Sequence, residues 1–130
     1  MSNVLFVCIQ NAGRSQMAQA LFERIDDGRH QARSAGSRPA ERVHPEVVEV
    51  MREIGVDVSS DLPHRLDGAD MDWADVVVTM GCGDDCPFIP GKRYVDWEVT
   101  DPAGRPIDEV RAVRDDIDRR VRALADELER

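Results

Sequence analysis

The stretch from Val4 to Ile25 constrains the fold of this chain more than any other. Val4 to Val7 is an unbroken apolar run, the pattern of a strand buried on both faces of a parallel sheet. Met17, Leu21 and Ile25 recur every four residues, which predicts a helix over residues 15–25. A buried strand that leads through a loop into a helix is the first part of a βαβ unit, so the sequence favours an α/β fold with a parallel sheet.

The loop of this unit has the sequence CIQNAGRS, in which Cys8 ends the strand and Arg14 and Ser15 open the helix. Backbone N–H groups at a helix N-terminus bind anions, and a guanidinium adds charged hydrogen bonds to an oxyanion. We therefore expect a tetrahedral oxyanion above the sulfur, with Cys8 as its attacker. The predicted oxyanion-binding residues are Gln10, Asn11, Ala12, Gly13, Arg14 and Ser15.

The same residues have a simpler interpretation. Cys8 would be a buried thiol at a strand end and Arg14 a surface residue of the helix, and that interpretation suits a bare C-x5-R match. Here a strand precedes the loop and a serine and a helix follow it, which favours the catalytic interpretation. Gly13 allows a close approach of the backbone, and Asn11 can adopt a left-handed conformation.

Length and charge restrict the function classes. The chain has 130 residues, enough for one domain over 1–130 whose core needs no disulfide or metal scaffold. Its formal charge is -9, from 26 acidic and 17 basic residues, which argues against nucleic acid or an anionic membrane as a partner. No apolar run approaches the roughly 18 residues of a membrane span, and no signal-peptide pattern opens the sequence. We expect a cytoplasmic monomer.

Beyond the first unit, strands alternate with helices. Strands are predicted over residues 30–36, 74–80 and 92–97, and helices from near Pro45 to Gly55 and from Ile107 to the end. Residues 56–72 are expected to form mostly loop with one short helical turn. This pattern predicts a three-layer α/β fold with a four-stranded parallel sheet in the order 2-1-3-4. Ligands of such sheets bind beyond the carboxyl ends of the strands.

Three further residues fall at that same edge of the predicted sheet. Asp101, in the loop after the last strand, could protonate an oxygen as it leaves the substrate, although Asp-Pro alone is an ordinary turn sequence. Cys82 and Cys86 follow the third strand and could close a small disulfide, which makes them a candidate redox relay. Zinc is the competing interpretation. No metal site is predicted, because the spacing is not C-x2-C and the three histidines are scattered.

Three segments of the sequence resemble a known group of enzymes. CIQNAGRSQMA, VVVTMGCGDDCP and DWEVTDPAG resemble the thioredoxin-coupled arsenate reductases built on the low-molecular-weight protein tyrosine phosphatase fold, and the resemblance covers essentially the whole chain. It implies that Cys8 attacks arsenate bound by Arg14 while Asp101 acts as the acid. Cys82 would then attack Cys8, arsenite would leave, and Cys86 would form a disulfide with Cys82 that thioredoxin reduces. No bound cofactor is implied.

The chain departs from this group at two places. Its later cysteines are separated by three residues, a shorter spacing than is usual in the group. Some members bind potassium through an acidic residue on the first helix, whereas Gln19 occupies that place here, so no potassium site is expected.

Three alternative functions remain open. A small thiol such as mycothiol could release the adduct on Cys8, which would make Cys82 and Cys86 dispensable. A phosphatase acting on phosphotyrosine or a small phosphomonoester would need only Cys8, Arg14 and Asp101, but such loops resemble C-x5-R-S-P, whereas Gln16 and Met17 follow Ser15 here. A non-catalytic module that binds an oxyanion or a phosphoprotein is the third.

Overall fold

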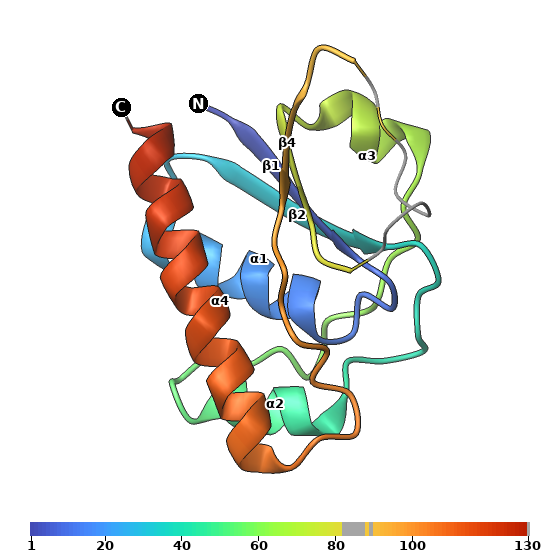
Figure 1. Cartoon of the computed structure of the whole chain (residues 1–130), viewed down its shortest axis with the longest axis vertical. Coiled ribbons are helices and arrows are strands. Elements are labelled where there is room, and N and C mark those ends of the chain that lie inside the picture. Colours follow the sequence, from blue (N-terminus) through green and yellow to red (C-terminus); the bar gives the residue numbers. More distant parts are fainter. Residues whose placement is uncertain (82–87, 89, 130) are drawn as a thin grey trace.

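Four parallel strands form the sheet of this protein in the order β2-β1-β3-β4 (Figure 1). The computed structural model describes residues 1–81, 88 and 90–129. The strands are β1 (Asn3–Cys8), β2 (Gln31–Gly36), β3 (Val76–Thr79) and β4 (Arg93–Asp96). Strand β1 pairs in parallel with both β2 and β3, and β3 pairs with β4. The predicted sheet and its strand order are confirmed, although β3 and β4 are shorter than expected.

The helices also follow the predicted order. They are α1 (Arg14–Asp26), α2 (Pro45–Arg52), α3 (Gly68–Trp73) and α4 (Ile107–Leu128). Helix α3 is the short helical segment expected near the end of residues 56–72. Its start is fixed by a reciprocal capping box, in which the side chains of Asp67 and Asp70 each accept a hydrogen bond from the other's backbone N–H.

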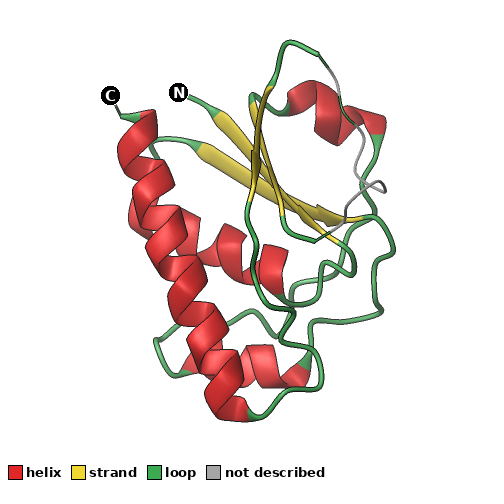
Figure 2. Cartoon of the chain, in the orientation of Figure 1, coloured by secondary structure: helices red, strands yellow, loops and turns green. Residues whose placement is uncertain are grey.

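The sheet has an apolar cluster on each face, and helices cover both clusters (Figure 2). Val4, Phe6 and Cys8 point to the side of α1, α2 and α4, where they join the larger cluster. Leu5 and Val7 point to the opposite side and pack with Met71 of α3. Because successive residues of β1 alternate between these clusters, the whole run is buried, as its sequence predicted.

The long helix α4 packs mainly on α1 through a regular apolar stripe. The stripe consists of Val110, Val113, Ile117, Val121 and Leu124, all buried. Met80 and Trp97 are buried in the core, whereas Trp73 is less deeply buried. Its ring is only partly buried, packs against the smaller cluster, and carries the guanidinium of Arg33 at 4.2 Å from its centroid.

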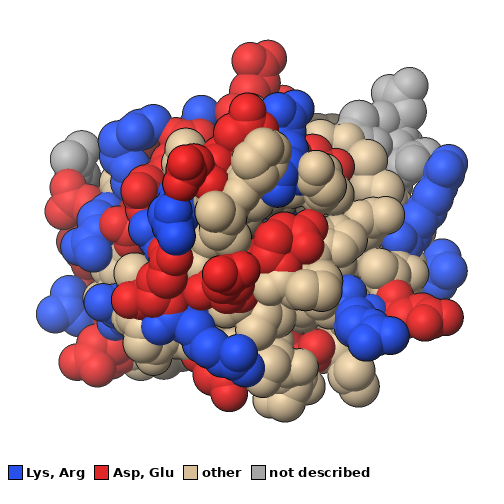
Figure 3. All heavy atoms as spheres, turned by 90° about the horizontal axis from the view of Figure 1, so that it is seen from below, with Lys and Arg blue, Asp and Glu red and all other residues tan. Residues whose placement is uncertain are grey.

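Acidic and basic side chains are intermingled on the face shown in Figure 3. One group of them joins α2 to α4. The carboxylate of Glu53, at the end of α2, accepts hydrogen bonds from Arg111 at 2.9 and 3.0 Å and from Arg114 at 2.8 Å. These bonds hold the pKa of Glu53 below its usual value. Among the described helices, none is both long and apolar enough to cross a membrane.

Candidate functional site

Cys8 lies at the carboxyl end of β1, and its side chain is buried. Its Sγ is 2.9 Å from the hydroxyl oxygen of Ser15 in the first turn of α1. Distance alone does not say which of the two groups donates, because both a thiol and a hydroxyl can donate or accept.

The side-chain amide of Asn11 fixes the direction of this hydrogen bond. The backbone N–H of His64 donates to Oδ1 of Asn11 at 2.8 Å, and a backbone N–H requires an acceptor, so this atom is the amide oxygen. Nδ2 of Asn11 therefore faces Ser15 and donates to its hydroxyl oxygen at 2.7 Å. The hydroxyl hydrogen of Ser15 is left for the sulfur of Cys8, and a thiolate is the stronger acceptor for it.

The carbonyl groups of the loop turn outward to the segment that follows β2. The carbonyls of Cys8, Ile9, Gln10 and Ala12 accept hydrogen bonds from the backbone N–H groups of Ser37, Arg38, Ala40 and His44 at 2.8–3.2 Å. Within the described part of the chain, no hydrogen bond uses the N–H groups of residues 10–13 as donors, so these groups are left to bind an anion. That is the arrangement of an anion-binding nest.

Two special backbone positions permit this arrangement. Asn11 adopts a left-handed conformation with φ of 49°, which asparagine tolerates better than most residues. Gly36 lies so close to the loop that a Cβ there would come within 2.6 Å of the carbonyl oxygen of Ile9 and 2.9 Å of the backbone nitrogen of Asn11. Glycine at position 36 therefore lets β2 end directly against the oxyanion loop.

Helix α1 begins at this loop with an uncompensated positive end. Its N-cap is Gly13, which makes no side-chain cap, and its first turn, which lies within the described residues, contains no acidic residue. The orphan N–H groups and the helix dipole therefore favour a negative ligand at this end. Gln10 lies at the exposed rim of the loop, where its Oε1 is 2.9 Å from Nε2 of His44, and the oxyanion-binding role of Gln10, Ala12 and Gly13 stays a prediction.

The guanidinium of Arg14 lies between the loops that follow β3 and β4. Its Nη1 donates to the carbonyl oxygen of Val99 at 3.3 Å, and its Nη2 is 3.8 Å from Oδ2 of Asp101. Only 9% of the Arg14 side chain is exposed, so its charge is largely removed from solvent. A largely desolvated guanidinium at the end of the loop that starts with Cys8 is suited to bind an oxyanion.

Asp101 is brought to the same place from the loop after β4. One carboxylate oxygen accepts a hydrogen bond from the backbone N–H of Ala103 at 3.0 Å, and the other faces Arg14. The side chain is 55% exposed, so protons can exchange with water. The structure thus pairs Cys8 with Ser15 and Arg14 with Asp101, and Pro102, next to Asp101, lies against Gly13 of the loop that follows β1. The predicted residues Cys82 and Cys86 lie outside the described residues.

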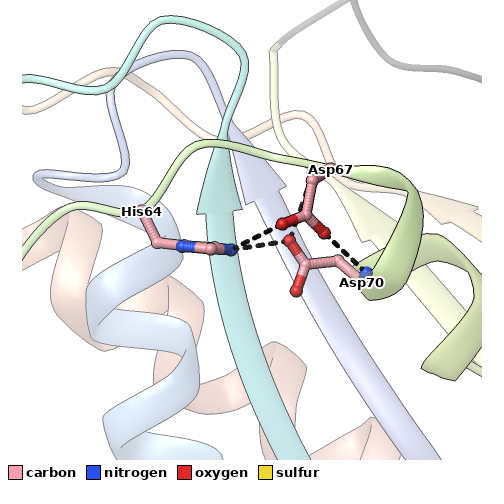
Figure 4. Close-up of side chains that lie close together, drawn as sticks. All are labelled: His64, Asp67 and Asp70. Carbon is pink, nitrogen blue, oxygen red and sulfur yellow. Dashed lines mark hydrogen bonds and ion pairs between the residues drawn. The ribbon is translucent and has the colours of Figure 1, made fainter.

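His64, Asp67 and Asp70 form a side-chain cluster at the start of α3 (Figure 4). Nε2 of His64 is 2.8 Å from Oδ2 of Asp70, and Nη1 of Arg33 is 3.7 Å from Oδ1 of the same carboxylate. The backbone N–H of Asp70 holds the pKa of Asp67 below its usual value. The geometry could admit a cation, but every member already has a partner, and the helix cap accounts for the arrangement.

A hollow of about 580 Å³ lies next to this cluster. Its lining includes Gln19, whose Oε1 accepts a hydrogen bond from the hydroxyl of Ser34 at 2.6 Å. Glu23 and Asp61 also line it, and burial raises the pKa of both carboxyl groups. The prediction that no potassium binds near Gln19 stays a prediction.

Comparison with known proteins identifies the family. Residues 3–130 match the family described as low molecular weight phosphotyrosine protein phosphatase. The chain belongs to this family. A glutaredoxin arsenate reductase of Synechocystis is 33% identical over 127 residues, which cover 95% of this chain and 96% of that protein.

Solved structures of the family include both reductases and phosphatases. A thioredoxin-dependent arsenate reductase of Corynebacterium glutamicum superposes with a TM-score of 0.86 at 42% identity, covering 99% of this chain and 62% of that one. This chain therefore spans less than two thirds of that protein. An arginine phosphatase of Geobacillus stearothermophilus superposes equally well, with a TM-score of 0.86 at 28% identity, covering 99% of this chain and 94% of that one.

Sequence reasoning missed two contributors to this family site. The backbone of His64 orients Asn11, but a contact made by a backbone N–H leaves no signature in the residue type. Gly81 lies against the guanidinium of Arg14. Its position next to Cys82 is visible in the sequence, but the residue type does not indicate a contact with Arg14.

Proposed function

We propose that this protein reduces arsenate to arsenite, for arsenic detoxification, with Cys8 as the nucleophile. The observation that carries this proposal is a buried thiol, in contact with Ser15, at the start of a loop whose carbonyls accept hydrogen bonds from outside it and which ends at the largely buried side chain of Arg14. Relatives named arsenate reductases cover nearly all of the chain, and two further cysteines stand in the sequence at Cys82 and Cys86.

In the first step the thiolate of Cys8 attacks the arsenic of bound arsenate. Arg14, Ser15 and the N–H groups of residues 10–13 would hold the remaining oxygens. One arsenic–oxygen bond breaks, and Asp101 supplies a proton so that this oxygen leaves as water. The product is a covalent adduct with a bond between sulfur and arsenic, in which arsenic is still pentavalent.

The two electrons for reduction come from thiols in the following steps. The thiolate of Cys82 attacks the sulfur of Cys8, the sulfur–arsenic bond breaks, and its electron pair stays on arsenic, which leaves as arsenite. Cys86 then attacks Cys82, which frees the Cys8 thiolate and leaves a disulfide between Cys82 and Cys86. A thiol reductant must take this disulfide back to two thiols, and thioredoxin is the proposed partner.

A coupled assay tests the proposal. Purified protein is given arsenate, thioredoxin, thioredoxin reductase and NADPH, and NADPH consumption is followed. Wild type should turn over, Cys8→Ser should be inactive, and Cys82→Ser and Cys86→Ser should lose multiple turnover. A Cys8→Ser variant with full activity would refute the nucleophile. Cys82→Ser and Cys86→Ser could instead turn over fully with mycothiol, or with glutathione and glutaredoxin. That result would show that an external thiol, and not Cys82 and Cys86, releases arsenite from Cys8.

Phosphomonoester hydrolysis is the second candidate function. It is favoured by the family match and by the arginine phosphatase that this structure resembles. Cys8, Arg14 and Asp101 are sufficient for it, with a phosphorylated Cys8 as the intermediate. Hydrolysis of para-nitrophenyl phosphate or phosphoarginine without arsenate-dependent oxidation of thioredoxin would make phosphatase activity the main function.

A further inference from the structure

Gly81 lies directly against the side chain of Arg14. It follows Met80, whose backbone N–H donates to the carbonyl oxygen of Val7 at 2.8 Å and so holds the end of β3 beside β1. A Cβ on Gly81 would be 2.5 Å from Nη1 of Arg14, 3.2 Å from Cζ and 3.4 Å from Nη2. A real Cβ does not approach another atom as closely as the first of these distances, so the guanidinium occupies space that only glycine leaves open.

The guanidinium has little freedom to move away from such a Cβ. Its Nη1 is held by the carbonyl oxygen of Val99 and its Nη2 faces Asp101. The Arg14 side chain is 9% exposed, so solvent offers little alternative space. Any displacement that relieved a contact at position 81 would also change the contacts to Val99 and Asp101.

We propose that Gly81 is a positioning residue for the oxyanion site, because its bare backbone forms the surface on which the Arg14 guanidinium rests. This inference depends on the proposed function, in which Arg14 binds the oxyanion. Gly81 is also the residue directly before Cys82 in the sequence.

The backbone of Gly81 has a φ of +83°, so a substitution there adds strain as well as a steric contact. Gly28 provides a matched control. Its φ is +81°, and a Cβ there would meet nothing within 4 Å. Gly81→Ala and Gly28→Ala therefore share the backbone strain, and only the first affects Arg14.

The test measures the binding of inorganic phosphate to the reduced protein by calorimetry. A displacement of about 1 Å in a positioning group can cost on the order of a hundredfold in rate, so Gly81→Ala should weaken phosphate binding at least about tenfold and raise KM for arsenate. Gly28→Ala should bind phosphate like wild type while losing similar thermal stability. Equal phosphate binding by the two alanine variants would overturn the proposal.

An Arg14→Lys background separates contact from strain. Lysine lacks the atoms that a Cβ at position 81 would meet, so adding Gly81→Ala to Arg14→Lys should weaken phosphate binding further by less than about threefold, a coupling between contacting residues. If Gly81→Ala weakens phosphate binding as much in the Arg14→Lys background as in the wild-type background, the effect comes from backbone strain. That result would overturn the positioning role. Unchanged phosphate binding by Arg14→Lys alone would instead refute the oxyanion role of Arg14 in the proposed function.

A measurement on the wild-type protein covers the case in which Gly81→Ala fails to fold. Phosphate is titrated into labelled protein while the Gly81 amide and the Arg14 Nε–H signals are followed by NMR. Both signals should shift and saturate at the same phosphate concentration, with the Gly28 amide unchanged. A Gly81 amide that does not respond while Arg14 does would overturn the proposal.

Discussion

The side-chain amide of Asn11 donates to the hydroxyl oxygen of Ser15 at 2.7 Å, and this bond directs the hydroxyl hydrogen of Ser15 toward the sulfur of Cys8. The orientation is set from outside the loop by the backbone N–H of His64. The sulfur of Cys8 is thus linked through the Asn11 side chain to His64, which lies 53 positions after Asn11 in the chain.

Ser15→Ala should slow the reaction of Cys8 with both arsenate and alkylating agents. A hydrogen bond to a charged group is worth about 1.5–3 kcal/mol, so the loss should be roughly 10- to 100-fold. The measurement is the rate of iodoacetamide alkylation at neutral pH in a Cys82→Ser/Cys86→Ser background, where only Cys8 reacts. Ser34→Ala, at another buried serine, should react at the background rate. A Ser15→Ala rate equal to that of the Ser34→Ala control would contradict the account.

Asn11→Gly should reduce turnover at least about tenfold, because it removes the amide that orients Ser15. Glycine tolerates the positive φ at this position, so the variant separates the hydrogen bonds from backbone strain. His64→Ala is the contrasting variant. It keeps the backbone N–H that contacts Asn11 and loses the imidazole contacts to Asp70 at 2.8 Å and Asp67 at 3.9 Å.

Steady-state arsenate reduction should therefore be slowed mainly in Asn11→Gly. The free energy of unfolding in urea should be the quantity that changes in His64→Ala. His64→Ala should keep turnover within about threefold of wild type and lose about 1 kcal/mol of stability, since its partly exposed side chain makes one hydrogen bond. A larger loss of turnover in His64→Ala than in Asn11→Gly would show that the imidazole, rather than the backbone, matters to the site.

Asp101→Asn should lower kcat by on the order of 10²- to 10⁴-fold, the usual contribution of a general acid. Asparagine keeps the acceptor for the backbone N–H of Ala103, so the loop should retain its shape. The proton-transfer role predicts a much smaller loss with a substrate whose leaving group needs no proton. In the phosphatase reaction, an aryl phosphate with a strongly acidic phenol is such a substrate. Asp96→Asn, at the end of β4, serves as the control and should be fully active.

Glu53 should make stability depend on pH in the acid range. Its pKa in the folded protein is lowered, first by the hydrogen bond from Arg111, so its contribution is complete above the unfolded value of about 4.3 and is lost as pH falls through the folded value. Urea unfolding between pH 3 and pH 7 should show that the free energy of unfolding falls less toward acid pH in Glu53→Gln than in wild type. Glu49→Gln, one turn earlier on α2, should behave like wild type. High salt should make the difference between Glu53→Gln and wild type smaller.

The fold was predictable because each local pattern agreed with the same architecture. The apolar run of β1 indicated burial on both faces, and the alternation of strands and helices restricted the sheet to parallel crossovers. Helix α3 was harder to predict from composition, because its six residues contain a glycine and two aspartates. Its start depends on a capping box, in which spacing matters more than residue type.

The candidate site was predictable in its residue types but not in its supporting contacts. Cys8, Arg14 and Asp101 could be placed at one edge because the carboxyl ends of parallel strands meet there. The packing of Arg14 on Gly81 and the bond from His64 to Asn11 join segments more than 50 residues apart. No local pattern encodes such contacts, because they depend on the register of the finished sheet.

The amount of arsenite released in a single turnover, without external reductant, tests the central claim most directly. Each reduced wild-type chain should release about one arsenite, since one disulfide supplies the two electrons. Cys86→Ser should release the same amount and end with a disulfide between Cys8 and Cys82. Cys8→Ser and Cys82→Ser should release none. Stoichiometric arsenite from Cys8→Ser, or none from wild type, would contradict the account.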